Sequence, residues 1–205
     1  AYNVVSSGDP MVTLYGYLDG LLFKMLNAKG TVSFDINAKA IPVMKYKFIG
    51  EYSPVSDTTF PTGAVFTGFQ KPLTVGKVNT PTFTIHGHAG VCQALSFDAA
   101  NEVNYRDLIN AAGAYSPDRS PVGSASIELP SVAAANFAEL TRTAAEGVLQ
   151  LVHGTVAGNI VQFDAPKVQF TAPPQVTNDS DVAMVGLQFS LNPNAGNDEF
   201  VLTVK

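Results

Sequence analysis

Two histidines and the single cysteine come nearest to a catalytic pattern in this chain. His86 and His88 are separated by one glycine, and Cys92 follows in the next predicted strand. Imidazoles at i and i+2 on a strand point to the same face, where they would be able to share a metal ion. No third ligand is identifiable, and the glycines at 87 and 90 indicate a turn. We therefore interpret the segment as a turn with solvated histidines.

Two further groupings resemble parts of an enzyme site. A cysteine near a histidine is the pattern of a nucleophilic enzyme, but cysteine is among the residues most often simply buried, so we predict that Cys92 is a core thiol. Asp98 and Glu102 flank a predicted turn, where carboxylates are more typical as turn residues than as an acid and base pair. The sequence has no glycine-rich phosphate loop. We predict that the protein is not an enzyme, with no catalytic, cofactor-binding or metal-binding residue and no cofactor.

The charge content is low for a chain of 205 residues. Charged residues make up 14%, with 12 Lys and Arg against 17 Asp and Glu, a formal net charge of −5; ordinary domains carry about 25%. A polar but weakly charged surface is typical of extensive self-contact. The scattered basic residues argue against specific nucleic-acid binding. No apolar run reaches the roughly 20 residues needed to cross a bilayer, so no membrane association is expected.

Alternation of apolar and polar residues, punctuated by Gly and Pro, predicts a mainly β chain. In residues 31–39, for example, Phe34 and Ile36 share one face and Ser33, Asp35 and Asn37 the other. We expect this strand to pair antiparallel with 43–52, and we place a turn at 27–30. The predicted strands are 11–15, 21–26, 31–39, 43–52, 82–86, 91–97, 101–109, 123–129, 148–153, 159–165, 182–191 and 199–204.

One helix is expected, over residues 131–146. Ser131 is a plausible N-cap and Gly147 stands at a C-cap position. The apolar stripe Ala133, Phe137, Leu140 and Ala144 predicts an amphipathic helix that packs on a sheet. The architecture is therefore a β-sandwich or barrel with one packed helix, formed by a single domain over residues 1–205.

Residues 53–81 interrupt the strand pattern. They contain several prolines and glycines but also many large apolar side chains. Loops this long are uncommon in compact domains, and a disordered linker lacks so many apolar residues. We interpret the segment as an extended loop that packs against another surface. The alternative is an irregular segment that wraps over the protein's own core.

A second distinctive segment runs from Tyr115 to Pro130. Asp118 and Arg119 lie in a turn bounded by prolines, before an alternating strand. Asp118 is expected to accept hydrogen bonds from nearby backbone amides. Arg119 is a candidate for a polar network or a contact between subunits.

The order of these segments resembles that of the tail tube proteins of long-tailed bacteriophages and prophages. The resemblance rests on the runs LYGYLDGLLFKMLNAKGTVSFDINAKAIPVMKYKFIGEY (14–52), LSFDAANEVNYRDLI (95–109) and SPDRSPVGSASIELP (116–130), followed by the predicted helix. It covers residues 14–147, and the likeness is to the tubes of flexible, non-contractile tails.

This resemblance implies hexameric rings whose subunits share a continuous inner β-barrel. The rings stack into a hollow tube around a tape measure protein, between tail terminator and tail-tip proteins, and phage DNA passes through the lumen without specific binding. Such a protein is a virion component made in the host bacterial cytoplasm. Candidate lumen-facing residues are the polar strand positions Ser33, Asp35 and Asn37, or Ser124, Ser126 and Glu128. Candidate contacts between subunits or rings are Phe60, Val65, Phe66, Phe69, Leu73 and Arg119.

The sequence leaves two other functions open. A head-tail joining or tail-tip β protein, or an adhesin-like binding module, remains the main alternative. A binding module would expose an aromatic patch, and the chain has no Trp. The placement of Tyr46, Phe48 and Tyr52 is that of buried residues, which disfavours a binding module. An enzyme using His86, His88 and Cys92 is the least favoured function.

Overall fold

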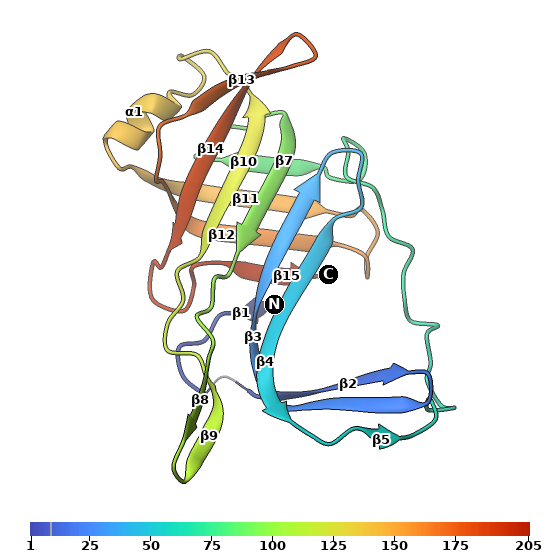
Figure 1. Cartoon of the computed structure of the whole chain (residues 1–205). Helices are drawn as coiled ribbons and strands as arrows, with labels where there is room; N and C mark the ends of the chain where they lie inside the picture. The colour runs from blue at the N-terminus through green and yellow to red at the C-terminus, as the bar shows by residue number, and fades with distance from the viewer. Residues whose placement is uncertain (9) are drawn as a thin grey trace.

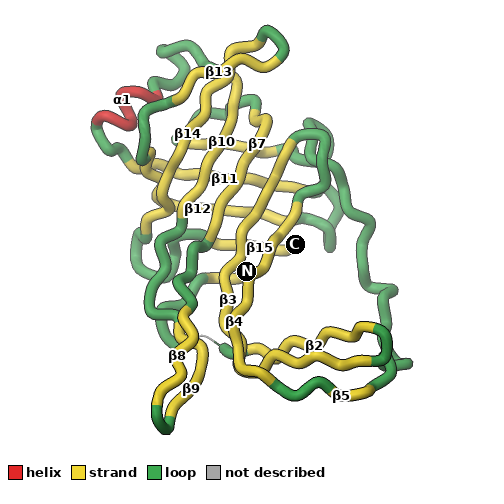
Figure 2. Tube along the Cα trace, viewed as in Figure 1, coloured by secondary structure: helices red, strands yellow, loops and turns green. Residues whose placement is uncertain are grey.

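β-Strands form almost all of the regular structure in the computed structural model, which describes residues 1–8 and 10–205 (Figures 1 and 2). Within these residues the elements are, in chain order, β1 (Tyr2–Asn3), β2 (Val12–Leu18), β3 (Leu21–Asn37), β4 (Val43–Tyr52), β5 (Ser56–Asp57), β6 (Thr82–Ile85), β7 (Cys92–Asp98), β8 (Asn104–Leu108), β9 (Ala111–Tyr115), β10 (Val122–Glu128), α1 (Phe137–Arg142), β11 (Glu146–His153), β12 (Val161–Phe170), β13 (Gln175–Asp179), β14 (Val182–Asn192) and β15 (Val201–Val204).

Most strands belong to one antiparallel sheet in the order β1-β15-β12-β14-β10-β7-β3-β2; in addition β11 pairs with β12, β6 with β11, β13 with β14, and β4 and β5 with β3. The sheet changes direction at β12, whose first residues pair with β15 and whose last residues pair with β14. As a result, the group β14-β10-β7-β3 crosses in front of β11, β12 and β15 (Figure 1). The sheet is not closed, because β4 pairs only with β3 among the described residues.

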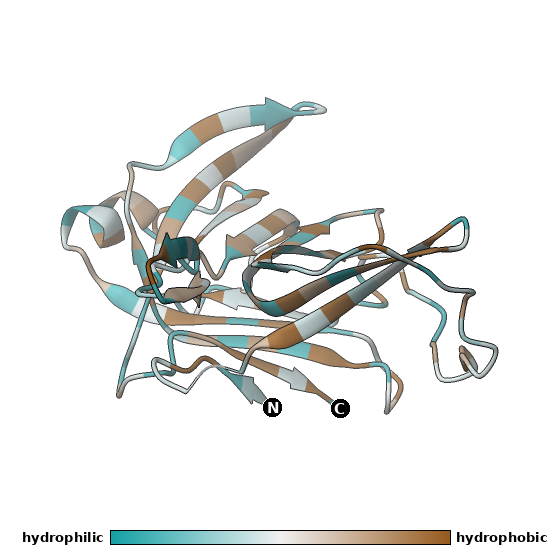
Figure 3. Ribbon diagram, turned by 60° about the horizontal axis from the view of Figure 1, so that its bottom comes forward, coloured by the Kyte–Doolittle hydropathy of each residue, from teal (hydrophilic) through white to brown (hydrophobic). Residues whose placement is uncertain are grey.

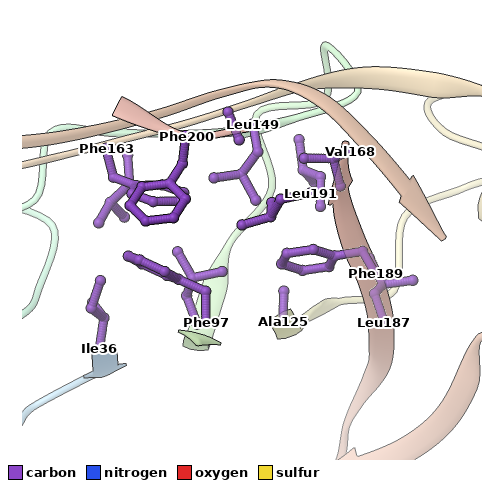
Figure 4. Close-up of a cluster of buried hydrophobic side chains, with 14 of the residues drawn as sticks. Ile36, Phe97, Ala125, Leu149, Phe163, Val168, Leu187, Phe189, Leu191 and Phe200 are labelled. Carbon is purple, nitrogen blue, oxygen red and sulfur yellow. The ribbon is translucent and has the colours of Figure 1, made fainter. Parts of the chain in front are cut away.

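The core lies between these two groups of strands (Figure 4). Phe97 of β7 stacks on Phe34 of β3, with ring centroids 4.2 Å apart, and on Phe163 of β12 at 3.8 Å. Phe189 from β14 and Leu149 from β11 extend the same apolar cluster. The predicted half-buried strand at 31–39 and its antiparallel pairing with 43–52 are confirmed.

The predicted turn at 27–30 is wrong, because β3 is a continuous strand through these residues. Asn27 adopts a positive φ of 48°, and the pairing register with β4 shifts between Leu26 and Lys29. This is a β-bulge, which bends a strand without ending it. Gly30 marks a close approach: a Cβ there would lie 2.5 Å from the Lys47 carbonyl oxygen.

The helix is much shorter than predicted. Asn136, not Ser131, is the N-cap, and its side chain accepts a hydrogen bond from the Glu139 amide. The helix stops before Ala144, which has a positive φ of 52°. Of the predicted apolar stripe, Phe137 is buried and Leu140 half-buried, while Ala133 and Ala144 are exposed. Gly147 is not a C-cap but a residue of β11, and a Cβ at this position would lie 2.5 Å from the His86 ring.

The sequence prediction missed the two-residue strands β1 and β5 and two longer strands, β9 and β13. The expected strand at 101–109 turns back at Asn110, and β8 and β9 form a separate hairpin that projects from the sheet (Figure 1). The edge strand β13 pairs with β14 near the other end of the molecule. Residues 53–81 form the expected extended segment, with only the two-residue β5 as regular structure.

Apolar residues extend beyond the core onto exposed strands, as the brown bands of Figure 3 show. Met44 and Tyr46 lie on the core-facing side of β4, opposite Phe34 and Val32, yet both are exposed. The prediction that Tyr46 and Tyr52 are buried is wrong, since Tyr52 is 79% exposed; Phe48 is half-buried. The second layer of strands ends before it covers β4. No helix in the described part of the chain is long and apolar enough to cross a membrane.

Candidate assembly surfaces

The two histidines of the 86–88 turn are packed against aromatic rings. His86 has a φ of 49°, its Nε2 lies 2.8 Å from the Val168 carbonyl oxygen, and its ring stacks on Phe170. Burial lowers the pKa of His86 below its ordinary value. His88 meets Phe137 edge-on. The predicted turn is confirmed, and both histidines are half-buried, so they are only partly exposed to solvent. Within the described residues, no three His, Cys, Asp or Glu side chains are grouped so as to hold a metal.

The remaining catalytic candidates have structural partners. Burial raises the pKa of the Cys92 thiol to about 12, so the thiol stays protonated and unreactive at neutral pH. The Asp98 carboxylate accepts hydrogen bonds from Thr31 Oγ1 and from the Ala100 amide. Glu102 accepts one from Asn104 Nδ2 at 2.7 Å. Asp98 is the last residue of β7, and Glu102 lies in the connection between β7 and β8, so both carboxylates have structural partners.

One outer face of the sheet brings both predicted polar sets together. On β3, Asp35 lies opposite Ser96 of β7, and Ser96 lies opposite Ser124 of β10. The six predicted polar residues, three on β3 and three on β10, therefore lie on the same side of the three adjacent strands. Ala125 and Ile127 of β10 point to the core on the other side. The polar sheet face is defined by Ser33, Asp35, Asn37, Ser96, Ser124, Ser126 and Glu128.

Local pairing satisfies much of this polar sheet face. Asp35 forms an ion pair with Lys45 of β4, and Ser96 Oγ lies 2.9 Å from Ser124 Oγ. Ser126 Oγ donates to Gln93 Oε1, and Gln93 Nε2 donates to Asp179 Oδ2 of the β13 end at 2.5 Å. The surface is thus hydroxyl-rich, with its charges partly neutralised.

The extended segment at 53–81 is divided into a free part and an anchored part. Residues 59–72 are exposed throughout. Phe60 meets Tyr17 edge-on at 5.4 Å, and Phe66 stacks on Phe69 at 6.2 Å; these rings otherwise face solvent. Val65 is also exposed, whereas Leu73 is half-buried at the start of the anchored part.

Residues 73–80 are bound to the body of the protein. The Lys39 amide donates to the Val75 carbonyl oxygen at 2.9 Å, and the Val75 amide donates to the Ala40 carbonyl oxygen at 2.8 Å. His153 Nδ1 lies 2.9 Å from Thr80 Oγ1. Burial lowers the pKa of His153, partly offset by a hydrogen bond with the Leu73 backbone.

Arg119 forms a network within the chain. Its guanidinium donates to both carboxylate oxygens of Glu199, at 2.8 and 3.1 Å, and to the Val5 carbonyl oxygen at 2.6 Å. It also donates to Asn197 Oδ1, and the side chains of the ion pair are only 11% and 10% exposed. The predicted polar network is present, and it ties the N-terminal residues to the β14–β15 connection. Asp118 accepts a hydrogen bond from the Arg119 amide, as expected.

Three exposed apolar surfaces were not predicted from the sequence. They are the core-facing side of β4, the β2–β3 hairpin with Tyr15 and Leu18, and the β8–β9 hairpin with Ile109. Alternation of residue types indicates which side chains share a face, but it does not indicate whether another element covers that face.

Comparison with known families gives one match. A family model described as phage tail tube protein matches residues 2–192, which is nearly the whole chain. No curated protein matches the chain.

Proposed function

The chain belongs to the family of phage tail tube proteins, and is therefore a structural component of a phage tail; from this premise we propose that it forms stacked hexameric rings around a channel for DNA. In this proposal residues 1–205 act as one tail-tube domain, and sheets of neighbouring subunits join into a continuous barrel. The family is structural, and no catalytic activity is proposed.

The main support in the structure is the amount of apolar surface that the single chain leaves uncovered. The open edge at β4 exposes backbone hydrogen-bonding groups beside apolar side chains such as Met44 and Tyr46. Edges of this kind promote pairing with another chain, and natural proteins normally protect them. A ring of subunits would cover this edge in every copy.

The polar sheet face is the surface we assign to the channel. Its hydroxyl groups and its carboxylates Asp35 and Glu128 offer no concentrated positive charge to phosphate groups. Carboxylates repel DNA, so a lumen of this chemistry would let it slide. The tape measure protein would occupy the same channel before DNA enters, with tail terminator and tail-tip proteins at the two ends.

The free part of the extended segment is proposed to contact a neighbouring subunit or the next ring. Among the described residues, its exposed rings Phe60, Phe66 and Phe69 have no ring contact with the body beyond that of Phe60 with Tyr17. Such a segment gains apolar contacts only through assembly.

Electron microscopy with light-scattering mass analysis across a concentration series tests the proposal. Rings of six 21.6 kDa chains, or tubes with an open bore, are expected. A chain that stays monomeric at every concentration, also with its tape measure protein added, would contradict the tube and favour a joining or tail-tip role.

The role of the segment has its own test. Replacing residues 59–69 by a Gly/Ser sequence of equal length should leave the melting temperature nearly unchanged, because these residues make few contacts with the body. The same replacement should abolish tubes. Tubes that still form with normal length would exclude the segment from assembly.

A further inference from the structure

A small apolar opening lies at the uncovered edge of the core. It has a volume of about 90 Å³ and lies where β3 and β4 meet the ends of β11, β12 and β15. Phe34, Ile36 and Met44 line one side, and Phe163 and Leu202 line the other. Leu202 belongs to β15, so the opening lies close to the C-terminal strand. It gives access to the centre of the core from outside.

An isoleucine without contacts projects elsewhere on the molecule. Ile109 is at the tip of the β8–β9 hairpin and is 93% exposed, and its neighbour Leu108 is also exposed. The turn is closed by Asn110 with a φ of 67°, a conformation that Asn tolerates well. Turn positions favour small polar residues, so a branched aliphatic side chain here contributes nothing to the hairpin itself.

The two features lie on different sides of the molecule. The hairpin projects at the lower left of Figure 1, and its strands contact β3 and β4. A subunit therefore cannot fill its own opening with its own Ile109. A contact between two different surfaces of identical chains is head-to-tail, and repeated contacts of that kind close into rings or continue as filaments.

Size favours Ile109 over the exposed phenylalanines of residues 59–72 as the occupant. An apolar cavity of about 150 Å³ is large enough to bind benzene. The opening here is about 90 Å³, which suits a branched aliphatic side chain better than a phenyl ring. Its lining is almost wholly apolar, with His153 as the one titratable residue among those that line it.

We propose that Ile109 of one subunit inserts into the core-edge opening of the next subunit. This inference rests on the proposed function and specifies one of its contacts between subunits. The insertion completes the core of the receiving subunit at the side where the second strand layer ends.

Substitution of Ile109 is the first test. Ile109→Asp should raise the protein concentration needed for half-maximal assembly by about 10-fold or more, the effect of losing a buried aliphatic side chain. Ile109→Leu should assemble like the wild type. Both variants should keep the wild-type circular dichroism and melting temperature, since the tip makes no contact with the body. Normal assembly of Ile109→Asp would overturn the inference and leave the tube function standing.

Cross-linking identifies the receiving surface. Ile109→Cys and Met44→Cys are prepared as separate proteins, mixed, assembled and oxidised. A disulfide-linked dimer containing one chain of each kind is expected from the mixture and not from either variant alone, because the contact is head-to-tail. The wild type controls for Cys92, whose thiol is shielded by burial. Assembly without this dimer would overturn the inference; a wild type that never assembles would overturn the proposed function as well.

Discussion

Phenylalanines in the core and in residues 59–72 have opposite surroundings. Phe163 is 1% exposed and stacks on Phe97 with ring centroids 3.8 Å apart. Phe69 is 79% exposed, and within the described part of the chain its ring contacts only that of Phe66 in the same segment. The same residue type therefore has two roles in this chain. In the core it stabilises the fold, while in the free segment it is available to another molecule.

The difference indicates that stability and assembly depend on separate side chains. Core substitutions should unfold the protein, whereas substitutions in the free segment should leave a folded chain that does not assemble. Each of the following experiments tests which of the two groups a residue belongs to.

The largest loss of stability is expected for Phe163→Ala. Removing a buried aromatic side chain should lower the free energy of unfolding by about 3–5 kcal/mol. Urea denaturation followed by fluorescence or circular dichroism measures this loss. A loss of less than about 1 kcal/mol in the free energy of unfolding would mean that the ring stack around Phe97 does not hold the two strand layers together.

Arg119→Met tests whether Arg119 belongs with the core. The substitution leaves the nearly buried Glu199 without its partner, and breaking such a pair costs about 3 kcal/mol of stability. Arg142→Met is the matched control, since its ion pair with Glu139 is exposed and its loss should leave stability nearly unchanged. If Arg119→Met lost assembly but not stability, Arg119 would instead be a subunit contact.

The attachment of residues 73–80 to the body of the protein, in which His153 takes part, should depend on pH. The pKa of His153 is lowered in the fold, so protonation favours the unfolded chain. Stability is therefore complete above the ordinary pKa of 6.5 and falls as the pH decreases toward the folded value. Melting temperatures between pH 8 and 5 should show a smaller decline for His153→Gln. His86 acts in the same direction, so the decline should not vanish. If the melting temperature of His153→Gln fell with pH as steeply as that of the wild type, this role of His153 would be contradicted.

The smallest effect on stability is expected for Phe69→Ser. An exposed side chain without contacts on the body should change the free energy of unfolding by less than about 0.5 kcal/mol. Tube length or yield should nevertheless fall in electron micrographs. A clear loss of stability would show that Phe69 packs on the body, and the contrast with Phe163 would then disappear.

Much of the fold could be predicted from the sequence, because alternation reports directly on which side chains share a face. Phe34 and Ile36 were predicted to be on the buried face, and they are. The continuous β3 and the short helix could not be predicted, because both depend on backbone conformation. Asn27 adopts a positive φ within a strand, and Ala144 ends the helix in a conformation unusual for alanine.

The surfaces were predicted less completely than the strands. The sequence identified both polar sets, but only the pairing of β3, β7 and β10 places Asp35 and Ser124 on one face. It also identified the extended segment without separating its free and anchored parts, since that division depends on the distant residues Ala40 and His153. Coverage by another layer is a property of tertiary structure, which is why the exposure of Tyr46 was missed.

The continuous β3 has a mechanical consequence. Its 17 residues give a contour of about 55 Å, running from the β2–β3 hairpin into the centre of the core. A force applied along this strand loads many hydrogen bonds of its ladders at once, instead of opening them one after another. The bulge at Asn27 is where the ladder with β4 is interrupted, so it is the place where the hairpin can bend relative to the core. A tail built from such subunits would combine resistance to stretching with flexibility in bending.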